Sequence, residues 1–198
     1  MITNTMKSVA VYCGSSSGNQ EIYTQQAQEM GRELARRGLT LVYGGGCVGL
    51  MGTIADAVLA EGGRVIGVIP GFLADKELAH QGCTELHVVD TMHQRKLLMA
   101  DLAEGFVAMP GGFGTLEELF EVLTWGQLGL HGKPVGVLNT QGFYDSLLAL
   151  LDHMSTEAFL RPENRGQVLQ NASAAALLDA MQAYQPVRLE KWLTPEKS

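Results

Sequence analysis

The segment from Pro110 to Glu118, PGGFGTLEE, combines two features that act on an anion in opposite ways. Its glycines and the free backbone amides at the start of an expected helix suit an anion such as phosphate. Glu117 and Glu118 would repel that same anion. Because one helical turn rises roughly 5.4 Å, Glu118 would lie about a sugar's width from a phosphate held at the turn. The segment therefore predicts an anion site with carboxylates close beside it.

More polar residues continue along the same expected helix. Glu117, Glu121 and Thr124 recur at helical spacing on a face away from the apolar stripe, with Glu118 beside them. The helix dipole favours acids in a first turn without any further role, so a single glutamate would indicate little. The combination of a glycine turn, a hydroxyl and several carboxylates within two turns favours a binding site.

A pair of bases, Arg95 and Lys96, lies in the first two turns of another expected helix, which follows a plausible N-cap at Thr91. Two solvated bases are the simpler interpretation of such a pair. The helix dipole disfavours cations near a helix N-terminus, however, and a nearby anion would remove that penalty. The pair is therefore a candidate for the same site.

The sequence GGGCVG, residues 44–49, matches the G-x-G-x-x-G pattern of dinucleotide-binding proteins and stands between an expected strand and an expected helix. Dinucleotide sites also need an acid near the end of the next strand to bind the ribose. That strand ends in VIGVIPG, without an acid. A mononucleotide site or a structural glycine turn is therefore favoured over NAD or FAD.

Short apolar runs alternate with longer helical patterns along the chain, which is typical of an α/β fold. We expect strands at 8–13, 39–44, 64–70, 85–90, 105–110 and 134–139, and helices at 19–37, 49–61, 91–104, 115–128, 143–157 and 172–183. The strands are continuously apolar, so helices should cover both faces of a doubly wound, Rossmann-like, mostly parallel sheet. In such sheets ligands bind beyond the carboxyl ends of the strands, where three glycine-rich turns are expected here.

The length indicates a single domain over residues 1–198, with a core of about 8–184 and a tail at 185–198. Its glycine turns make a Rossmann-like nucleotide-binding domain the expectation. The net charge of −7 argues against broad binding to nucleic acid. No signal peptide or membrane span is evident, and three widely spaced cysteines suit reduced thiols, so we expect a cytoplasmic protein. The histidines and cysteines show no metal-ligand spacing, and we expect neither a metal nor a cofactor.

The segments YGGGCVGLMG, MHQRK and PGGFGTLEELFEVLTWGQLG together resemble the signature segments of the LONELY GUY family of cytokinin-activating phosphoribohydrolases. The family hallmark, PGGxGTxxE, is complete here, and the similarity extends from about Ser8 to Tyr184. The resemblance implies a homodimeric enzyme that hydrolyses N6-modified adenosine 5′-monophosphates to the free base and ribose 5-phosphate. Relatives also carry an older label, lysine decarboxylase, but no lysine here stands in a setting suited to pyridoxal phosphate.

By position, the resemblance implies that Arg95 and Glu118 are catalytic. It places a second set of residues in contact with the nucleotide: Glu77, Lys96, Gly111, Gly112, Phe113, Gly114, Thr115, Leu116, Glu117 and Thr124. A carboxylate beside the anomeric carbon would stabilise oxocarbenium-like charge and orient or deprotonate water. We expect Glu118 in that role and Glu117 as a ligand of the ribose or of another part of the substrate, although the two could be exchanged. The alternative function is a non-catalytic nucleotide or cofactor carrier on the same fold.

Overall fold

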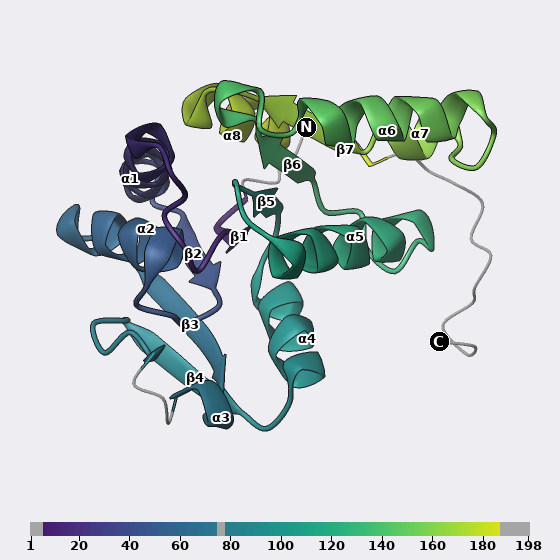
Figure 1. Cartoon of the computed structure of the whole chain (residues 1–198). Coiled ribbons are helices and arrows are strands. Elements are labelled where there is room, and N and C mark those ends of the chain that lie inside the picture. The colour runs from purple at the N-terminus through teal and green to yellow at the C-terminus, as the bar shows by residue number, and fades with distance from the viewer. Residues whose placement is uncertain (1–5, 75–77, 187–198) are drawn as a thin grey trace.

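A computed structural model describes residues 6–74 and 78–186 of the chain. Its centre is a wholly parallel sheet in the order β4-β3-β2-β1-β5-β6-β7 (Figure 1). This confirms the expected doubly wound α/β fold. The strands are β1 (Ser8–Tyr12), β2 (Thr40–Tyr43), β3 (Val65–Pro70), β4 (Glu85–Val89), β5 (Phe106–Ala108), β6 (Val135–Leu138) and β7 (Val168–Asn171).

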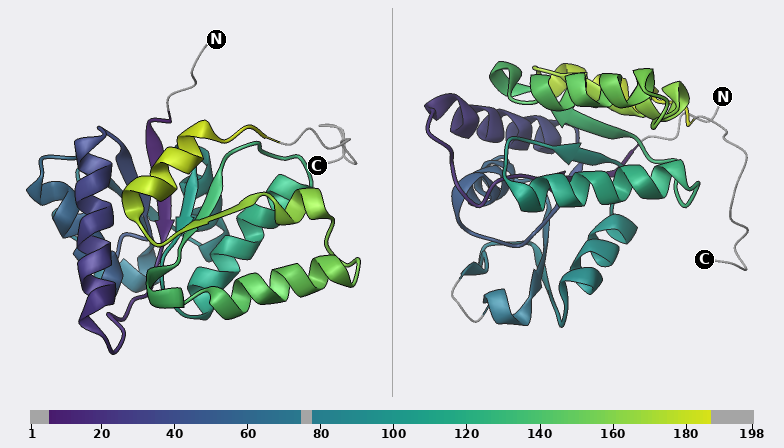
Figure 2. Two further views of the ribbon diagram at one scale, coloured as in Figure 1. Left: turned by 90° about the horizontal axis from the view of Figure 1, so that it is seen from above. Right: turned by 45° about the vertical axis from the view of Figure 1, so that its right-hand side comes forward.

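Helices cover both faces of the sheet. The helical elements are α1 (Glu21–Arg36), α2 (Gly49–Ala60), α3 (Gly71–Leu73), α4 (Met92–Leu102), α5 (Phe113–Gln127), η2 (Thr140–Gly142), α6 (Asp145–Thr156), α7 (Pro162–Arg165) and α8 (Ala174–Ala183). One buried cluster joins α1, α2 and α8 to one face, and a second joins α4, α5 and α6 to the other. In Figure 2, α1 and α8 lie side by side, and an ion pair of 2.8 Å between Arg37 and Asp179 connects them.

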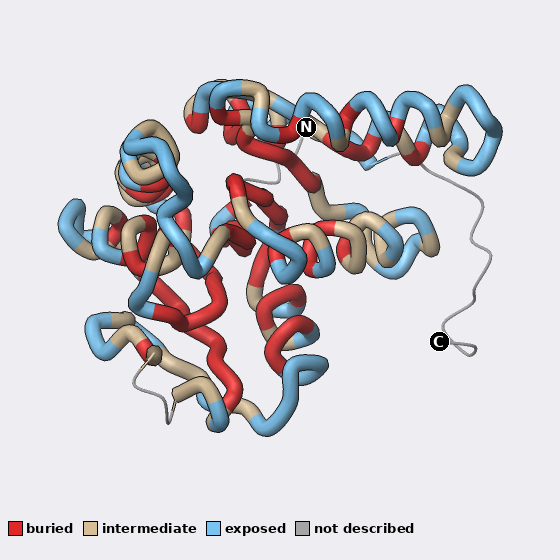
Figure 3. The backbone as a smooth tube through the Cα atoms, in the orientation of Figure 1, coloured by how far each residue is buried: buried red, intermediate tan, exposed pale blue. Residues whose placement is uncertain are grey.

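The alternation of side chains along a strand explains these two layers. In β1, Val9 and Val11 belong to the α1–α2–α8 cluster, whereas Ala10 and Tyr12 belong to the α4–α5–α6 cluster. Both sets are buried, which is why the strand reads as a continuous apolar run. Figure 3 shows the burial concentrated in the strands and on the inward sides of the helices.

The six expected strands and six expected helices are all present within a few residues. The seventh strand, β7, was not predicted, because its sequence VLQN is short and half polar; at the sheet edge only its first residue, Val168, is buried. Residues 187–198 of the expected tail lie outside the described residues, so the domain and tail boundaries stay a prediction. No helix in the described ranges is long and apolar enough to cross a membrane.

The order of the strands positions the site. The chain moves outward from β1 to β4 on one side and then returns to β5 on the other side of β1. The connections after β1 and β5 therefore diverge to opposite faces of the sheet and leave a crevice at the carboxyl ends of these two strands. Ligands of open α/β sheets bind at such a switch point.

Candidate functional site

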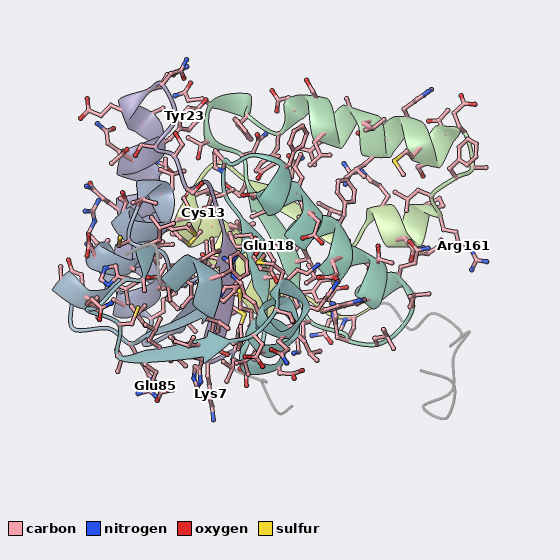
Figure 4. All side chains as sticks on the ribbon, turned by 60° about the horizontal axis from the view of Figure 1, so that its bottom comes forward. Lys7, Cys13, Tyr23, Glu85, Glu118 and Arg161 are labelled. Carbon is pink, nitrogen blue, oxygen red and sulfur yellow. The ribbon has the colours of Figure 1, made fainter. Side chains whose placement is uncertain are left out.

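A pocket of about 420 Å³ occupies this crevice, bounded by the carboxyl ends of β1, β2, β3 and β5 and by the first turns of α4 and α5. Figure 4 labels Cys13, at the end of β1, and Glu118, on α5, which both line it. Its further lining residues are Val11, Tyr12, Gly14, Ser15, Gly44, Gly46, Val48, Met51, Ile69, Leu73, Leu78, Met92, Arg95, Gly112, Phe113, Gly114, Thr115 and Glu117. The three expected glycine turns, which follow β1, β2 and β5, thus all contribute residues to this pocket.

The glycine turn after β5 leads directly into α5, which begins at Phe113, two residues earlier than expected. No side chain caps the helix at its N-cap, Gly112, and a Cβ built on Gly112 or Gly114 would meet nothing within 4 Å. The turn is attached to the loop after β1, because the Gly14 amide donates to the Pro110 carbonyl at 3.1 Å. An open helix N-terminus of this kind is suited to bind an anion through its amides.

Glu118 lies in the second turn of α5 with only 9% of its surface exposed. Its Oε1 is 3.9 Å from Nη2 of Arg95, and both side chains line the pocket. Burial raises the pKa of Glu118 to about 7, Arg95 opposes this rise, and Glu117 adds to it. Near neutral pH this carboxyl group therefore exists in both protonation states, which suits a group that accepts or donates a proton.

Arg95 reaches this position because Gly44, after β2, has no side chain. A Cβ at position 44 would lie 1.7 Å from Nη2 of Arg95, so the guanidinium occupies the space that any other residue would fill. Nε of Arg95 is buried and has no hydrogen-bond partner within the described chain. A buried donor without an acceptor is costly in a folded protein. The site therefore holds an unused donor beside a buried carboxyl group.

Lys96 does not line the pocket but connects α4 to α5. It is bonded to Glu117 and, at 3.1 Å, to Glu121. Burial lowers the pKa of Lys96, but these bonds to carboxylates outweigh burial and the net shift is upward. Lys96 is thus a charged tie between the two helices that carry Arg95 and Glu118, and it holds the Glu117 side chain at the edge of the pocket.

Only some of the remaining predicted site residues line the pocket. Gly112, Phe113, Gly114 and Thr115 line the pocket, and Gly111 adjoins it in the turn. Leu116 packs partly buried against the core. Thr124 donates a hydrogen bond of 2.7 Å to the Phe120 carbonyl and lines a separate cavity of about 140 Å³ between α5, α6 and β7. Glu77 lies outside the described residues.

Sequence reasoning missed the apolar wall of the pocket. Its members come from the loop after β2, the first turns of α2 and α4, the end of β3 and the segments on either side of residues 75–77: Val48, Met51, Ile69, Leu73, Leu78 and Met92. Such residues look like ordinary core in a sequence. Their positions in the sequence could have identified them. Each lies at the end of a predicted parallel strand or follows one, and the carboxyl ends of parallel strands lie at one edge of the sheet. Among the described residues, no cluster of three or more His, Cys, Asp or Glu could hold a metal ion.

Comparison with known proteins gives concordant results. Residues 51–181 match the model of a family described as possible lysine decarboxylase. A cytokinin riboside 5′-monophosphate phosphoribohydrolase of Rhodococcoides fascians is 55% identical over 166 residues, which cover 83% of this chain and 84% of the relative. A protein of the same name from Arabidopsis thaliana is 47% identical over 185 residues, covering 93% of this chain and 87% of the relative.

Two solved structures show the same fold at lower sequence similarity. The molybdenum cofactor carrier protein of Chlamydomonas reinhardtii superposes with a TM-score of 0.68 at 23% identity. The molybdenum cofactor binding protein of Rippkaea orientalis superposes with a TM-score of 0.67 at 20% identity. In both cases the match covers 89% of this chain and 96% of the other. At these identities the similarity concerns the fold alone.

The family follows from the close relatives and the family model. The chain belongs to the LONELY GUY family of cytokinin riboside 5′-monophosphate phosphoribohydrolases.

Proposed function

We propose that the protein hydrolyses the N-glycosidic bond of N6-modified adenosine 5′-monophosphates and releases the free base and ribose 5-phosphate. The observation that carries the proposal is the buried Glu118 carboxyl group, 3.9 Å from Arg95 and one helical turn from an open helix N-terminus. This arrangement supplies an acid–base group about one helical turn, roughly 5.4 Å along the axis, from an anion site. The close relatives carry the name of this activity.

In the proposed complex, the 5′-phosphate binds the amides of the turn from Gly111 to Thr115, and Thr115 adds its hydroxyl. The ribose lies over the first turn of α5, where Glu117 is placed to contact its hydroxyl groups. The base then faces the apolar wall that contains Met51 and Leu78. An apolar N6 substituent would gain free energy by burial against this wall. Binding of the phosphate would hold the anomeric carbon in place for the reaction.

In the reaction, the bond between the anomeric carbon and the base nitrogen breaks, and its electron pair leaves with the base. Positive charge develops on the ribose, and the Glu118 carboxylate stabilises it. Glu118 accepts a proton from the water that adds its hydroxyl to the anomeric carbon, and this proton passes on to the departing base, so that water is divided between the two products. Arg95, with its unused buried Nε, is placed to interact with the phosphate or with the base as it leaves.

The substrate contacts of the other predicted residues are likewise proposals. Lys96 is bonded to Glu117 and Glu121, so its contribution would be to orient Glu117 and to balance the acidic cluster. Leu116 supports α5 from the core side. Thr124 lines a separate cavity, so its contact with the nucleotide is proposed from the resemblance alone. Glu77 retains its role as a substrate ligand by resemblance only.

The proposal is tested by incubating the purified protein with AMP and with isopentenyladenosine monophosphate and following base release by chromatography. We expect release, abolished in Glu118→Gln and reduced at least a hundredfold in Arg95→Ala. Glu157→Gln and Arg32→Ala, which alter an exposed acid after α6 and a base on α1, serve as matched controls. Binding of both nucleotides by the wild type without any release of base would refute hydrolysis and favour a carrier.

We further propose that the protein is a homodimer, that it is located in the cytoplasm and that it does not bind nucleic acid. The family resemblance is the reason for the homodimer. The net charge of −7 is the reason to exclude nucleic acid.

A further inference from the structure

Tyr144 immediately precedes α6 and lies far from the reacting groups in sequence, yet its side chain reaches the anion-binding turn. Its hydroxyl donates a hydrogen bond of 2.6 Å to the carbonyl of Met109, the residue before Pro110. Both residues are buried, with exposed fractions of 1% for Tyr144 and 0% for Met109. The Tyr144 hydroxyl is thus a direct contact between α6 and the start of the turn.

The Met109 carbonyl needs such a partner because the sheet ends there. The pairing of β5 with β6 stops at Ala108 and Val137, and the Met109 amide already donates to the Tyr12 carbonyl at 2.9 Å. The main chain then turns into Pro110 and Gly111. A buried carbonyl without a donor would leave the orientation of this peptide group less defined and cost free energy.

Tyr144 is itself held firmly. Its amide donates to Oδ1 of Asn139 at 2.7 Å, and Nδ2 of Asn139 donates to Asp145 at 2.7 Å. The Asn139 amide donates in turn to the carbonyl of Asn171, the last residue of β7. Burial, assisted by the nearby Cys13, raises the pKa of Tyr144, so the hydroxyl remains protonated and able to donate. Hydrogen bonds thus connect the start of the turn, through Tyr144 and Asn139, to the end of β7.

We propose that Tyr144 is a positioning residue for recognition of the substrate phosphate, and this rests on the proposed function. By fixing the Met109 carbonyl, it sets the direction in which the chain enters the turn, and hence the direction of the amides from Gly112 to Thr115. Displacements of a fraction of an ångström at such donors weaken binding of the phosphate and misplace the sugar to which it is attached. Tyr144 itself touches no reacting atom.

The test uses Tyr144→Phe, which removes only the hydroxyl and keeps the ring in its buried place. Ser8→Ala is the matched control, because the Ser8 hydroxyl donates to a backbone carbonyl, that of Leu102, at 2.8 Å at the opposite end of the sheet. For each protein, kcat/KM is measured with isopentenyladenosine monophosphate and with the same riboside lacking phosphate. The dissociation constant of ribose 5-phosphate is measured by calorimetry, and the thermal midpoint is recorded.

We expect Tyr144→Phe to reduce the preference for the 5′-phosphate about tenfold and to weaken binding of ribose 5-phosphate by a similar factor. Ser8→Ala should retain both values and lose only thermal stability. Equal thermal losses in the two variants, with phosphate preference and ribose 5-phosphate affinity unchanged in both, would show that Tyr144 is merely structural. Lack of turnover by the wild type would refute the proposed function instead, and calorimetry would still test the inference.

Discussion

At the scale of single residues, the central feature is Glu118, an acid whose burial disfavours its ionised form. The pKa of Glu118 is about 7 in the folded chain, against an ordinary value of 4.5, chiefly because of burial. The folded state therefore binds this proton more tightly than the unfolded state does. Protonated Glu118 favours folding below pH 4.5, and this contribution is lost as the pH rises through about 7.

We expect Glu118→Gln, which should abolish activity, to stabilise the folded protein at alkaline pH. Glu118→Gln should be more stable than the wild type at pH 8, by up to roughly 3 kcal/mol, and nearly equal to it at pH 4.5. Differences in unfolding free energy from urea denaturation at the two pH values measure this, with Glu157→Gln as the control. An equal difference at both pH values would contradict the effect of burial on Glu118.

The same scale shows what a sequence can reveal about a site. The hallmark from Pro110 to Glu118 and the pair Arg95–Lys96 could be recognised as motifs. The reason that Arg95 reaches Glu118, namely the absence of a side chain at Gly44, depends on three separate segments. The contact from Tyr144 to Met109 could not be predicted either, because nothing in either residue type indicates it.

At the scale of elements, α4 and α5 form a pair whose charges are shared. Lys96 on α4 forms ion pairs with Glu117 and Glu121 on α5, and its positive charge also lowers the pKa of Glu118. The two helices thus present Arg95 and Glu118 to the pocket while Lys96 connects them outside it. The position of α5 and the acidity of its catalytic candidate depend on the same ammonium group.

Replacing Lys96 with Gln should therefore move the activity profile along the pH axis. If ionised Glu118 accepts the proton, kcat/KM rises with pH through its pKa, and loss of Lys96 raises that pKa and shifts the rise to higher pH. The profile of kcat/KM against pH measures the shift. Lys133→Gln is the control, because the Lys133 ammonium is bonded to the Ala100 carbonyl near the end of α4. A profile that stays in place after Lys96→Gln would contradict the coupling.

Elements were also where prediction from sequence succeeded most. Apolar runs identified six strands and indicated a parallel sheet covered on both faces. The edge strand β4 departs from this pattern, because none of its residues is buried. β7 was missed because Gln170 and Asn171 give it no apolar periodicity, and its pairing with β6 is a tertiary effect. The start of α5 was placed two residues late because the glycines before Thr115 have low helix propensity, whereas the turn and the helix are continuous in the structure.

At the scale of the whole molecule, we expect a homodimer in solution. Size-exclusion chromatography with light scattering should give twice the monomer mass of 21.3 kDa. Phe113 is 94% exposed at the rim of the pocket, and Phe159 is 85% exposed, so the described surface offers large apolar side chains that association could bury. A mass equal to that of one chain at every concentration measured would refute the dimer.

The order of the strands also has a consequence for how the protein acquires its function as it folds. The pocket needs the loops after β1, β2 and β5, and β1 pairs with β5 across nearly half of the chain. Pairings of such long range close late, because a long loop must lose its conformational freedom before the contact forms. The anion-binding turn and the loop that it contacts at Gly14 are therefore brought together only when the centre of the sheet is complete. Recovery of catalytic activity would then follow the pairing of β1 with β5, and a form in which these two strands have not yet paired would release no base.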